Sequence, residues 1–254
     1  MQKPVEPREL LGVINALTSD DEDEPDGDRA HFGLLVGESA AMRAVYEQIE
    51  KVAGTDSTVF VQGESGTGKE LVADAIHRLS KRRGAFVPVN CGGLTKDLVS
   101  SQLFGHEKGS FTGASARHIG LFERANGGTL FLDEITEMPV DMQTQLLPRR
   151  ADERHGVVGG AEEIDVDARL VAATNRDPAE AVDEGQLRED LYFRLRVFPI
   201  VLPPLRERGD DIELLANWFL DELNVKNSTE KQLAPDALEA LQRHTWPGNV
   251  RELK

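Results

Sequence analysis

The sequence predicts an α/β fold, with a central parallel sheet flanked by helices and followed by a small helical subdomain. Short apolar runs alternate with segments of helical periodicity between about residues 39 and 174. A glycine-rich turn joins the first of these runs to the next helical segment. Beyond Pro203 the helical pattern continues without a further strand signal. Strands that alternate with helices are typical of parallel sheets, because each parallel connection needs a crossover.

The expected elements follow in order along the chain. Apolar residues at helix spacing predict helices over residues 39–53 and 70–79. Four apolar runs predict buried strands, over residues 58–62, 86–90, 128–133 and 168–174. Two further helices, over residues 210–223 and 235–244, would form the C-terminal subdomain.

The first 31 residues differ from the rest. Residues 1–17, with apolar side chains between Leu10 and Leu17, could form a short amphipathic helix, which would be marginal alone. Residues 20–28 are almost wholly acidic, as in a self-repelling disordered linker or a regulatory tail. We therefore expect three parts: an N-terminal segment with an acidic linker over residues 1–31, an α/β subdomain over 32–203, and a helical subdomain over 204–254.

The composition argues against several classes of protein. No apolar run approaches the ~18 residues of a membrane span, and the N-terminus lacks the apolar region of a signal peptide. The single cysteine, Cys91, excludes an intramolecular disulfide and fits a reducing cytoplasm. A formal charge of -16 argues against a broad basic face for nucleic acid. We expect a cytoplasmic protein with no membrane partner, which would bind DNA only through a region absent from this chain.

A glycine-rich loop follows the first predicted strand and opens a predicted helix. Backbone N–H groups in such a loop cradle phosphate oxygens, aided by the positive end of the helix. Lys69 would reach the β- and γ-phosphates. Glu70 stands where serine or threonine usually holds Mg²⁺, so Thr67 or a water-mediated contact could take that task. A glycine turn with a chance lysine is the simpler alternative, which the strand–loop–helix context disfavours. The expected nucleotide-binding residues are Gly63, Glu64, Ser65, Gly66, Thr67, Gly68, Lys69 and Glu70.

Carboxylates end a later apolar run, at Asp133 and Glu134. Asp133 is expected near Mg²⁺, partly through water, and Glu134 near the water that attacks the γ-phosphate. Together with the glycine-rich loop, these residues predict hydrolysis of a nucleoside triphosphate. Asn175 ends the next strand, where its amide could hold the water or the γ-phosphate, although an asparagine there is more often a turn former.

With these parts in order, the chain resembles the AAA+ P-loop ATPases. Further motifs, at family-like spacing, lie at residues 35–39, 63–70, 89–91, 103–114, 127–134, 188–195, 202–208 and 246–253. With these motifs the chain resembles, more narrowly, the central domain of bacterial enhancer-binding proteins, which activate sigma-54 RNA polymerase. The resemblance implies an ATP- and Mg²⁺-dependent ring, expected to be a hexamer, that acts on the sigma-54 RNA polymerase holoenzyme. Glu70 is usual in this family.

The resemblance also implies roles for single residues. Asn90 would hold Glu134 in an inactive pose until the nucleotide state releases it. Arg188 and Arg194 match arginine fingers, which reach the γ-phosphate bound in the neighbouring subunit and need an assembled ring. Arg251 resembles the sensor arginine that lays the lid over the nucleotide. Outside this motif context, each arginine would be interpreted as a member of a surface ion pair.

Residues 109–114, Gly-Ser-Phe-Thr-Gly-Ala, match the loop with which this family contacts sigma-54. The serine replaces the usual alanine, a small-for-small change that we expect to be tolerated. ATP hydrolysis would raise and lower the loop, which the resemblance puts at the tip of a helix insertion above the ring pore. A flexible glycine turn is the simpler alternative, but it would not need an aromatic residue. The expected partner-binding residues are Gly109, Ser110, Phe111, Thr112, Gly113 and Ala114, with Phe111 and Thr112 at the contact.

Residues 148–158 depart from the family pattern. Pro148 stands inside an expected helix, where it would remove a hydrogen bond and cost ~3 kcal/mol. Arg149 and Arg150 replace apolar residues, and Val157 replaces an arginine near the subunit interface. Either the helix ends early and the loop has diverged, or a short compensated reading-frame error entered the sequence. This segment makes the coupling between hexamer subunits the least secure expectation.

Two other functions fit part of these observations. A generic AAA+ remodeller of another protein would lack the loop at residues 109–114. A nucleotide-binding regulatory module with impaired hydrolysis would explain the unusual residues 148–158, but not the presence of Lys69, Asp133, Glu134 and both candidate fingers. Relatives usually continue through the rest of the lid to a helix-turn-helix, so we expect the lid to be truncated in this chain.

Overall fold

The computed structural model describes residues 31–32, 35–94, 99–110, 116–147, 154–156 and 163–254. Three sequence-based expectations lie outside the described residues: the short N-terminal helix, the acidic linker and the substitutions at residues 149, 150 and 157. Four residues of the candidate sigma-54 contact also lie outside them, namely Phe111, Thr112, Gly113 and Ala114.

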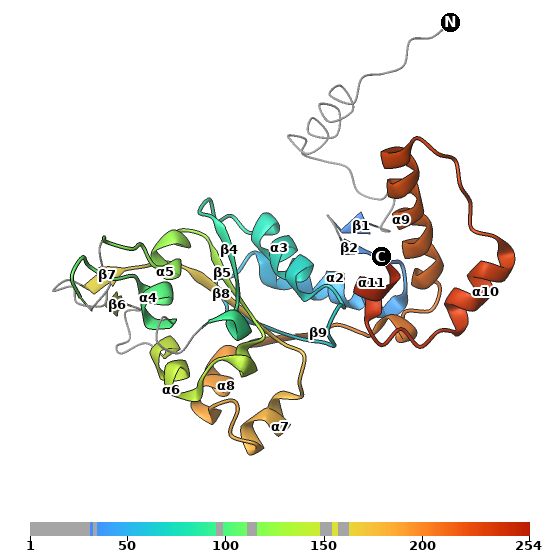
Figure 1. The fold of residues 1–254 in the computed structure, drawn as a ribbon. Helices are drawn as coiled ribbons and strands as arrows, with labels where there is room; N and C mark the ends of the chain where they lie inside the picture. Colours follow the sequence, from blue (N-terminus) through green and yellow to red (C-terminus); the bar gives the residue numbers. More distant parts are fainter. Residues whose placement is uncertain (1–30, 33–34, 95–98, 111–115, 148–153, 157–162) are drawn as a thin grey trace, which may run out of the picture.

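Five parallel strands form the central sheet of the described chain, in the spatial order β4-β5-β8-β3-β9 (Figure 1). The four strands predicted from the sequence are confirmed to within a residue. The fifth, β9, was not predicted; it is an edge strand and contains Pro199, which an edge tolerates because one side needs no partner. The strands are β3 (Val59–Gln62), β4 (Phe86–Asn90), β5 (Thr129–Asp133), β8 (Arg169–Thr174) and β9 (Phe198–Val201).

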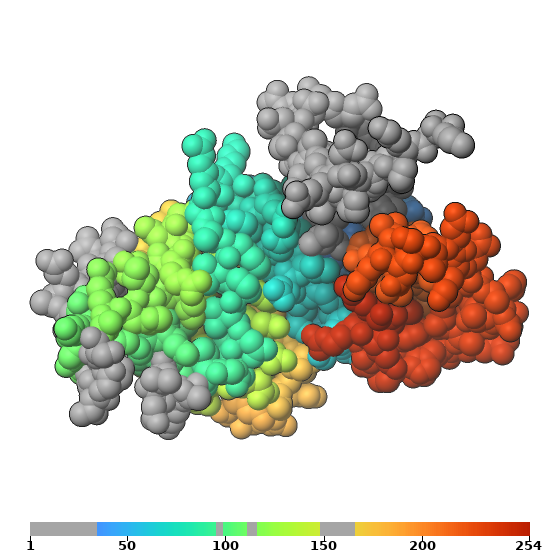
Figure 2. Space-filling model, turned by 45° about the horizontal axis from the view of Figure 1, so that its top comes forward, coloured from blue at the N-terminus to red at the C-terminus, as the bar shows by residue number. Residues whose placement is uncertain are grey.

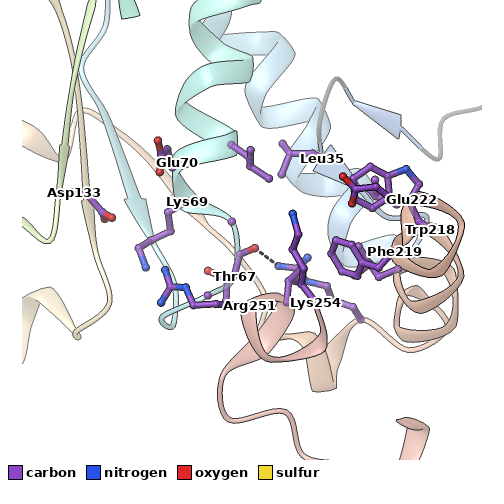
Figure 3. Close-up of a pocket in the computed structure, with 17 residues that line it drawn as sticks. Leu35, Thr67, Lys69, Glu70, Asp133, Trp218, Phe219, Glu222, Arg251 and Lys254 are labelled. Carbon is purple, nitrogen blue, oxygen red and sulfur yellow. Dashed lines mark hydrogen bonds between the residues drawn. The ribbon is translucent and has the colours of Figure 1, made fainter. Parts of the chain in front are cut away.

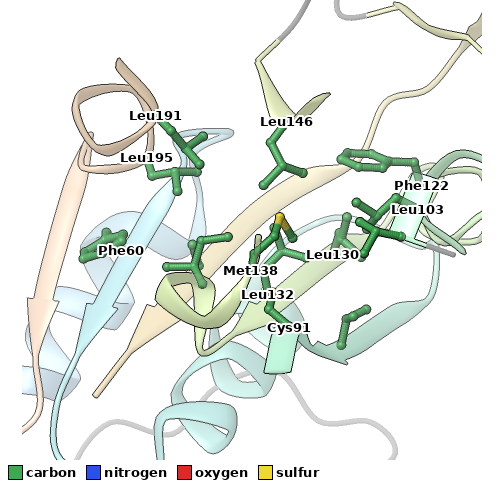
Figure 4. Packing of buried hydrophobic residues seen from close by; sticks show 14 of the residues in the cluster. Phe60, Cys91, Leu103, Phe122, Leu130, Leu132, Met138, Leu146, Leu191 and Leu195 are labelled. Carbon is green, nitrogen blue, oxygen red and sulfur yellow. The ribbon is translucent and has the colours of Figure 1, made fainter. Parts of the chain in front are cut away.

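Two apolar cores cover the two faces of this sheet. Side chains alternate between them along each strand, so that Leu130 and Leu132 of β5 enter one core while Phe131 enters the other. The first core, shown in Figure 4, is completed by α4 (Val99–Phe104), α5 (Leu121–Arg124), α7 (Pro178–Asp183) and α8 (Glu189–Leu195). The second is completed by α2 (Ala40–Ala53) and α3 (Lys69–Leu79). Burial of both faces explains why the strands are continuous apolar runs.

A helical lid forms a separate lobe beside the α/β part (Figures 1 and 2). It comprises α9 (Asp211–Asn227), α10 (Pro235–Arg243) and α11 (Asn249–Leu253), preceded by the 3-10 turn η4 (Leu205–Glu207). The two predicted helices are confirmed, α9 ending four residues later than expected, whereas α11 was not predicted. The apolar centre of the lid includes Leu215, Phe219 and Trp246, which cluster with Val36 of β2 (Leu35–Val36).

A buried carboxylate attaches the lid to the α/β part. Asp211, the first residue of α9, accepts hydrogen bonds from the backbone N–H groups of Glu38 (2.6 Å) and Ser39 (2.9 Å) and from the Ser39 hydroxyl (2.7 Å). These donors precede α2, whose N-terminus favours a negative charge. The Asp211 side chain, at the start of the lid helix α9, therefore accepts hydrogen bonds from the donors at the start of the core helix α2.

The helical run before Pro148 is short. α6 (Val140–Gln143) passes into the 3-10 turn η3 (Thr144–Leu146), and Leu147 has extended backbone angles (φ -80°, ψ 121°). The helix thus ends before the proline, which removes the expected conflict, because a residue before proline disfavours the helical conformation. This agrees with an early helix end; a reading-frame error stays a hypothesis.

The remaining elements are short. They are β1 (His31–Phe32), β6 (Arg154–Gly156), β7 (Glu163–Asp165), η1 (Cys91–Gly93) and η2 (Ile135–Glu137). Within the described residues, no helix has both the length and the apolar character needed to cross a membrane.

Candidate active site

The residues predicted to act on a phosphate meet at one edge of the sheet. Strand register pairs Asn90 of β4 with Asp133 of β5. The glycine-rich loop follows β3, Glu134 follows β5, and Asn175 follows β8. Because all these strands are parallel neighbours, their carboxyl ends lie side by side at the position where open α/β sheets bind ligands.

The glycine-rich loop, residues 63–68, turns tightly from β3 into α3. Gly66 and Gly68 have φ angles of 80° and 102°, which glycine adopts without steric cost. Thr67 is 1% exposed, and its hydroxyl donates to the carbonyl of Glu64 at 2.8 Å. In this arrangement the threonine hydroxyl supports the loop itself.

Lys69 begins α3 and is largely buried. Its ammonium donates to the carbonyl oxygens of Gly63 (2.9 Å) and Glu64 (3.2 Å). Burial lowers the pKa of Lys69, and the nearby carboxylates of Asp133 and Glu134 act in the opposite direction. The loop therefore holds a cation next to the acidic strand end, as a phosphate-binding lysine requires.

Asp133 and Glu134 form the acidic end of β5. Burial raises the pKa of Asp133, and the charge of Lys69 opposes that effect. Glu134 has a φ of 54°, a left-handed conformation that is uncommon outside glycine and concentrates at functional sites. Its carboxylate accepts from the Asn90 amide at 3.1 Å. Asn90 and Glu134, which the resemblance pairs, are thus in contact. The role of Asn90 in holding Glu134 in an inactive pose stays a prediction.

A cavity of about 420 Å³ lies between the glycine-rich loop and the lid (Figure 3). Lys69 and Asp133 lie at one end, and Arg208 and Arg251 add cationic groups to the wall. The other end is apolar and aromatic, lined by Leu35, Leu215, Trp218 and Phe219. A cationic end joined to an aromatic end suits a ligand with phosphates and a planar base. Glu70, Glu222 and Lys254 also line it.

The lid contacts the glycine-rich loop through Asn249. This side chain is fully buried; its Nδ2 donates to the Glu64 carboxylate (3.1 Å) and to the Ser65 carbonyl (3.0 Å). Its Oδ1 accepts from the backbone N–H of Leu205 at 2.8 Å. Arg251, the predicted sensor arginine, donates to the Ser65 hydroxyl at 2.9 Å. One lid turn therefore holds both the loop and the connection into the lid.

Two arginines of that connection also hold the loop. Arg206 makes a bidentate pair with Glu64 at 2.8 and 2.6 Å, which, with a hydrogen bond from Asn249, lowers the pKa of Glu64 to about 2. Arg208 is buried and donates to the carbonyl of Thr67 at 2.8 Å. The sequence analysis assigned no role to Asn249 or to these arginines, although they lie within motifs that carry the resemblance.

The candidate finger arginines lie outside this cavity. Arg188 precedes α8 and pairs with Asp190 at 3.0 and 2.7 Å. Arg194 lines a second cavity, of about 200 Å³, together with Thr58 and Arg169. Because Thr58 precedes β3 and Arg169 begins β8, this cavity lies at the amino ends of the strands. Arg194 is therefore at the opposite end of the sheet from the glycine-rich loop of its own chain.

Gly109 and Ser110 are the described part of the candidate contact loop. An antiparallel bridge between His106 and His118 joins the two sides of its base, with backbone hydrogen bonds of 3.0 and 2.9 Å. The two imidazole rings stack with their centroids 5.6 Å apart. The chain thus leaves and re-enters the α/β part at one place, between α4 and α5.

The strand–glycine loop–helix, the acidic end of β5 at the same edge of the sheet and the lid that lines the cavity define a P-loop NTPase of the AAA+ class. Comparison with known families agrees: the sigma-54 interaction domain matches residues 35–201, and the AAA+ ATPase lid domain matches residues 206–254. The chain belongs to the sigma-54 interaction domain family, whose members include sigma-54-dependent transcriptional regulators.

Similar proteins include a DNA-binding transcriptional regulator and a Nif-specific regulatory protein. NtrC of Rhizobium meliloti (strain 1021) is 46% identical over 258 residues, covering 100% of this chain and 53% of that protein. The Nif-specific regulatory protein of Rhodobacter capsulatus is 53% identical over 221 residues, covering 87% of this chain and 38% of that protein. The chain thus spans about half the length, or less, of these curated relatives. The crystal structure of NtrX from Brucella abortus in complex with ATP is 39% identical, with a TM-score of 0.79 over 86% of this chain and 48% of that chain.

Proposed function

We propose that this chain is an ATPase that remodels the sigma-54 RNA polymerase promoter complex as a ring, expected to be a hexamer. The observation that carries the proposal is the meeting of Lys69 and Asp133 at one end of a cavity that the lid also lines, with the Glu134 carboxylate close enough to Lys69 to act on its pKa. Membership of the sigma-54 interaction family supports the choice of partner, and the ATP complex of the related NtrX supports the choice of nucleotide.

In this function the glycine-rich loop and Lys69 bind the β- and γ-phosphates, and Arg251 reaches them from the lid. Glu134 orients a water molecule and accepts its proton as the water oxygen bonds to the γ-phosphorus and the bond to ADP breaks. Asn90, at 3.1 Å from the Glu134 carboxylate, controls the pose of that base. Asn175, which follows β8 at the same sheet edge, lies where its amide could hold the water or the γ-phosphate.

Asp133 is the residue that would hold Mg²⁺, which supplies neutralisation of the phosphate charge when bound. Magnesium sites beside nucleotides use one or two carboxylates together with phosphate oxygens and water. Asp133 fits this requirement because it is half-buried next to Lys69 at the phosphate end of the cavity. Burial raises its pKa, and a bound cation would offset that cost of its negative charge.

The arginines Arg188 and Arg194 would act on the nucleotide of a neighbouring subunit. The position of Arg194 at the amino ends of the strands supports action between chains, since the phosphate-binding loop of its own chain lies at the other end. A cation delivered in this way stabilises charge that develops in the transition state only after the ring has formed.

Residues 109–114 would carry the mechanical output to sigma-54, with Phe111 and Thr112 at the contact. The bridged base of this loop supports the assignment, because it attaches the loop at a single place between α4 and α5. Both helices add residues to the core that also packs under β5.

The test is formation of a sigma-54 complex in the presence of ADP and a γ-phosphate transition-state mimic. We expect the wild-type chain to form the complex and Phe111→Ala to lose it, with ATP binding unchanged. Ser110→Ala, which restores the usual family residue beside Phe111, is the matched control and should behave as wild type. Equal complex formation by wild type and Phe111→Ala would refute the role of this loop.

A further inference from the structure

Gln143 connects the catalytic loop of the subunit to the segment that presents the finger Arg188. We propose that Gln143 is a positioning residue that couples the hydrolysis site of its own subunit to the finger offered to the next subunit. The inference rests on the proposed function, because it needs Arg188 to act between chains.

The side chain of Gln143 is buried at the end of α6, and three backbone groups bond to it. Its Nε2 donates to the carbonyl oxygens of Met138 (3.0 Å) and Gln186 (2.7 Å). Its Oε1 accepts from the backbone N–H of Arg188 at 2.9 Å. Both amide hydrogens are thus used, along with one acceptor position. A side chain needed only for packing would be apolar, because a buried amide is costly unless its donors and acceptor are hydrogen-bonded.

One end of the connection leads to the catalytic base. Glu134 is followed by the 3-10 turn η2 (Ile135–Glu137), in which Glu137 N–H bonds to the Glu134 carbonyl at 2.9 Å and Met138 N–H to the Ile135 carbonyl at 3.2 Å. Ile135 and Met138 are both buried in the first core. A turn this short and this packed transmits a change of the Glu134 backbone to the carbonyl that Gln143 binds.

The other end fixes the base of the finger. Arg188 is the N-cap residue of α8, and its carbonyl accepts from Tyr192 N–H at 2.9 Å. Its guanidinium pairs with Asp190 in the same chain. To exchange Asp190 for a phosphate of another subunit, only the Arg188 side chain needs to move. The reach of that side chain depends on the Arg188 backbone, which Gln143 holds.

A second contact joins the same segments at the surface. Arg176, which directly follows Asn175, donates to the side chain of Gln186 at 2.8 Å and pairs with Glu137 at 3.1 Å. It is 45% exposed, so its ion pair is screened by solvent and contributes little. The buried amide of Gln143 is therefore the stronger connection. Arg176 adds a weaker contact between the finger segment and the end of β8.

The consequence concerns two nucleotides at once. Glu134 acts on the nucleotide bound by its own chain, whereas Arg188 acts on the one bound by the neighbour. A change of the Glu134 pose would thus reposition the finger through Met138 and Gln143. We expect Gln143→Leu to lower turnover between about ten- and a hundredfold, the size of effect expected from a small misplacement of a catalytic group. The KM for ATP should stay within about twofold, because binding groups are untouched.

The matched control is Gln145→Leu, the same exchange two residues away. Gln145 accepts a hydrogen bond from Ser100 at 2.8 Å and donates one to the Met142 sulfur at 3.4 Å, and both partners lie outside the finger segment. It should keep turnover within about twofold of wild type, because it leaves the catalytic groups in place. Should Gln143→Leu fail to fold, Gln143→Asn keeps the amide but shortens its reach and tests the same contact.

A mixing experiment separates action on the neighbour from damage to the variant's own site. Subunits with Lys69→Ala bind no nucleotide but retain the finger. When Lys69→Ala subunits are mixed with Gln143→Leu subunits, ATP turnover should exceed the sum of the two separate activities. The same should hold when they are mixed with Arg188→Ala subunits. If turnover rises for Arg188→Ala subunits but not for Gln143→Leu subunits, the inference about Gln143 is wrong, although the finger acts between chains. If turnover does not rise for Arg188→Ala subunits, the finger does not act between chains, and the inference is wrong with it.

Discussion

At the residue scale, the proposed function assigns nucleotide binding to Lys69 and hydrolysis to Glu134. The buried ammonium of Lys69 would neutralise phosphate charge, so Lys69→Ala should abolish ATP binding. Glu134→Gln keeps the shape of the site but removes the proton acceptor, so it should bind ATP normally and lower turnover by ~10²–10⁴-fold. Calorimetric titration with ATP and a phosphate-release assay measure the two effects.

The control for this pair is Glu47→Gln, which makes the same exchange at an exposed position of α2. It should leave both binding and turnover unchanged. Full turnover by Glu134→Gln would instead show that another group activates the water, and the assignment of the base would be wrong.

Glu64 gives the site a pH dependence. Hydrogen bonds from Arg206 and Asn249 lower its pKa from 4.5 to about 2. The folded state therefore favours the charged form, and the stability so gained is complete above pH 4.5 and is lost as the pH falls towards 2. The Glu64 side chain is 42% exposed, so the contribution should be below about 1 kcal/mol.

Urea unfolding of wild type and Glu64→Gln at a series of pH values measures this contribution. The difference in free energy of unfolding should be constant in the neutral range and become smaller below pH 4.5, as Glu64 is protonated. A difference that stays the same down to pH 3 would contradict the charged interaction with Arg206.

Sequence patterns predicted the site residues that lie in a loop or at a strand end. Lys69, Asp133 and Glu134 lie close together, as the glycine-rich loop and the acidic strand end indicated, and Asn90, which the resemblance indicated, contacts Glu134. Two residues that hold the site through distant partners were not predicted. Asn249 bonds to a carboxylate 185 positions away, and Gln143 to a backbone amide 45 positions away. Neither pairing leaves a periodic or compositional signal.

At the element scale, the turn before α11 and the glycine-rich loop form one packed unit. A Cβ atom on Gly66 would lie 2.3 Å from the carbonyl oxygen of Gly248, closer than any real contact allows. Asn249, next in the lid turn, has a φ of 52° and is fully buried. The lid turn therefore packs directly against the loop that is proposed to bind phosphate.

Asn249→Gly tests this dependence, because glycine accepts the positive φ angle and removes only the amide. We expect ATP affinity to fall several-fold and the melting temperature to fall by a few degrees, since the exchange also frees buried partners. Asn249→Ala should be more destabilising by about 1 kcal/mol, because alanine is strained at this φ. Calorimetric titration and thermal unfolding measure these changes.

Asn227→Gly is the matched exchange, at the exposed end of α9. It should leave ATP affinity unchanged. If Asn249→Gly bound ATP as tightly as this control, the contact between lid and loop would be structural only.

Two of the elements that were not predicted from the sequence, β9 and α11, share a physical cause. β9 has exposed residues alternating with buried ones and a proline in its second position, so it lacks the apolar run of a central strand. α11 has five residues, too few to be stable alone, and depends on the contacts of Asn249. Both elements are stabilised by tertiary contacts rather than by local preference.

At the scale of the whole molecule, the fold separates the two halves of the proposed chemistry. The phosphate-binding loop lies at the carboxyl ends of the strands and Arg194 at their amino ends. A single chain cannot bring them together without breaking the sheet. In the proposed ring, the same separation would let one chain offer a nucleotide cavity to one neighbour and an arginine to another.

This separation predicts that ATP turnover per chain rises with protein concentration until the ring is complete. Arg194→Ala should remain at a low, concentration-independent rate, because loss of an arginine finger costs on the order of 10³-fold. Arg196→Ala is the matched control: its guanidinium lies 5.5 Å from the ring centroid of Tyr192 in the same chain, so it should retain the rise. Phosphate release measured over a wide concentration range distinguishes the outcomes. A wild-type rate per chain that does not change with concentration, matched by Arg194→Ala, would show that each chain hydrolyses ATP alone.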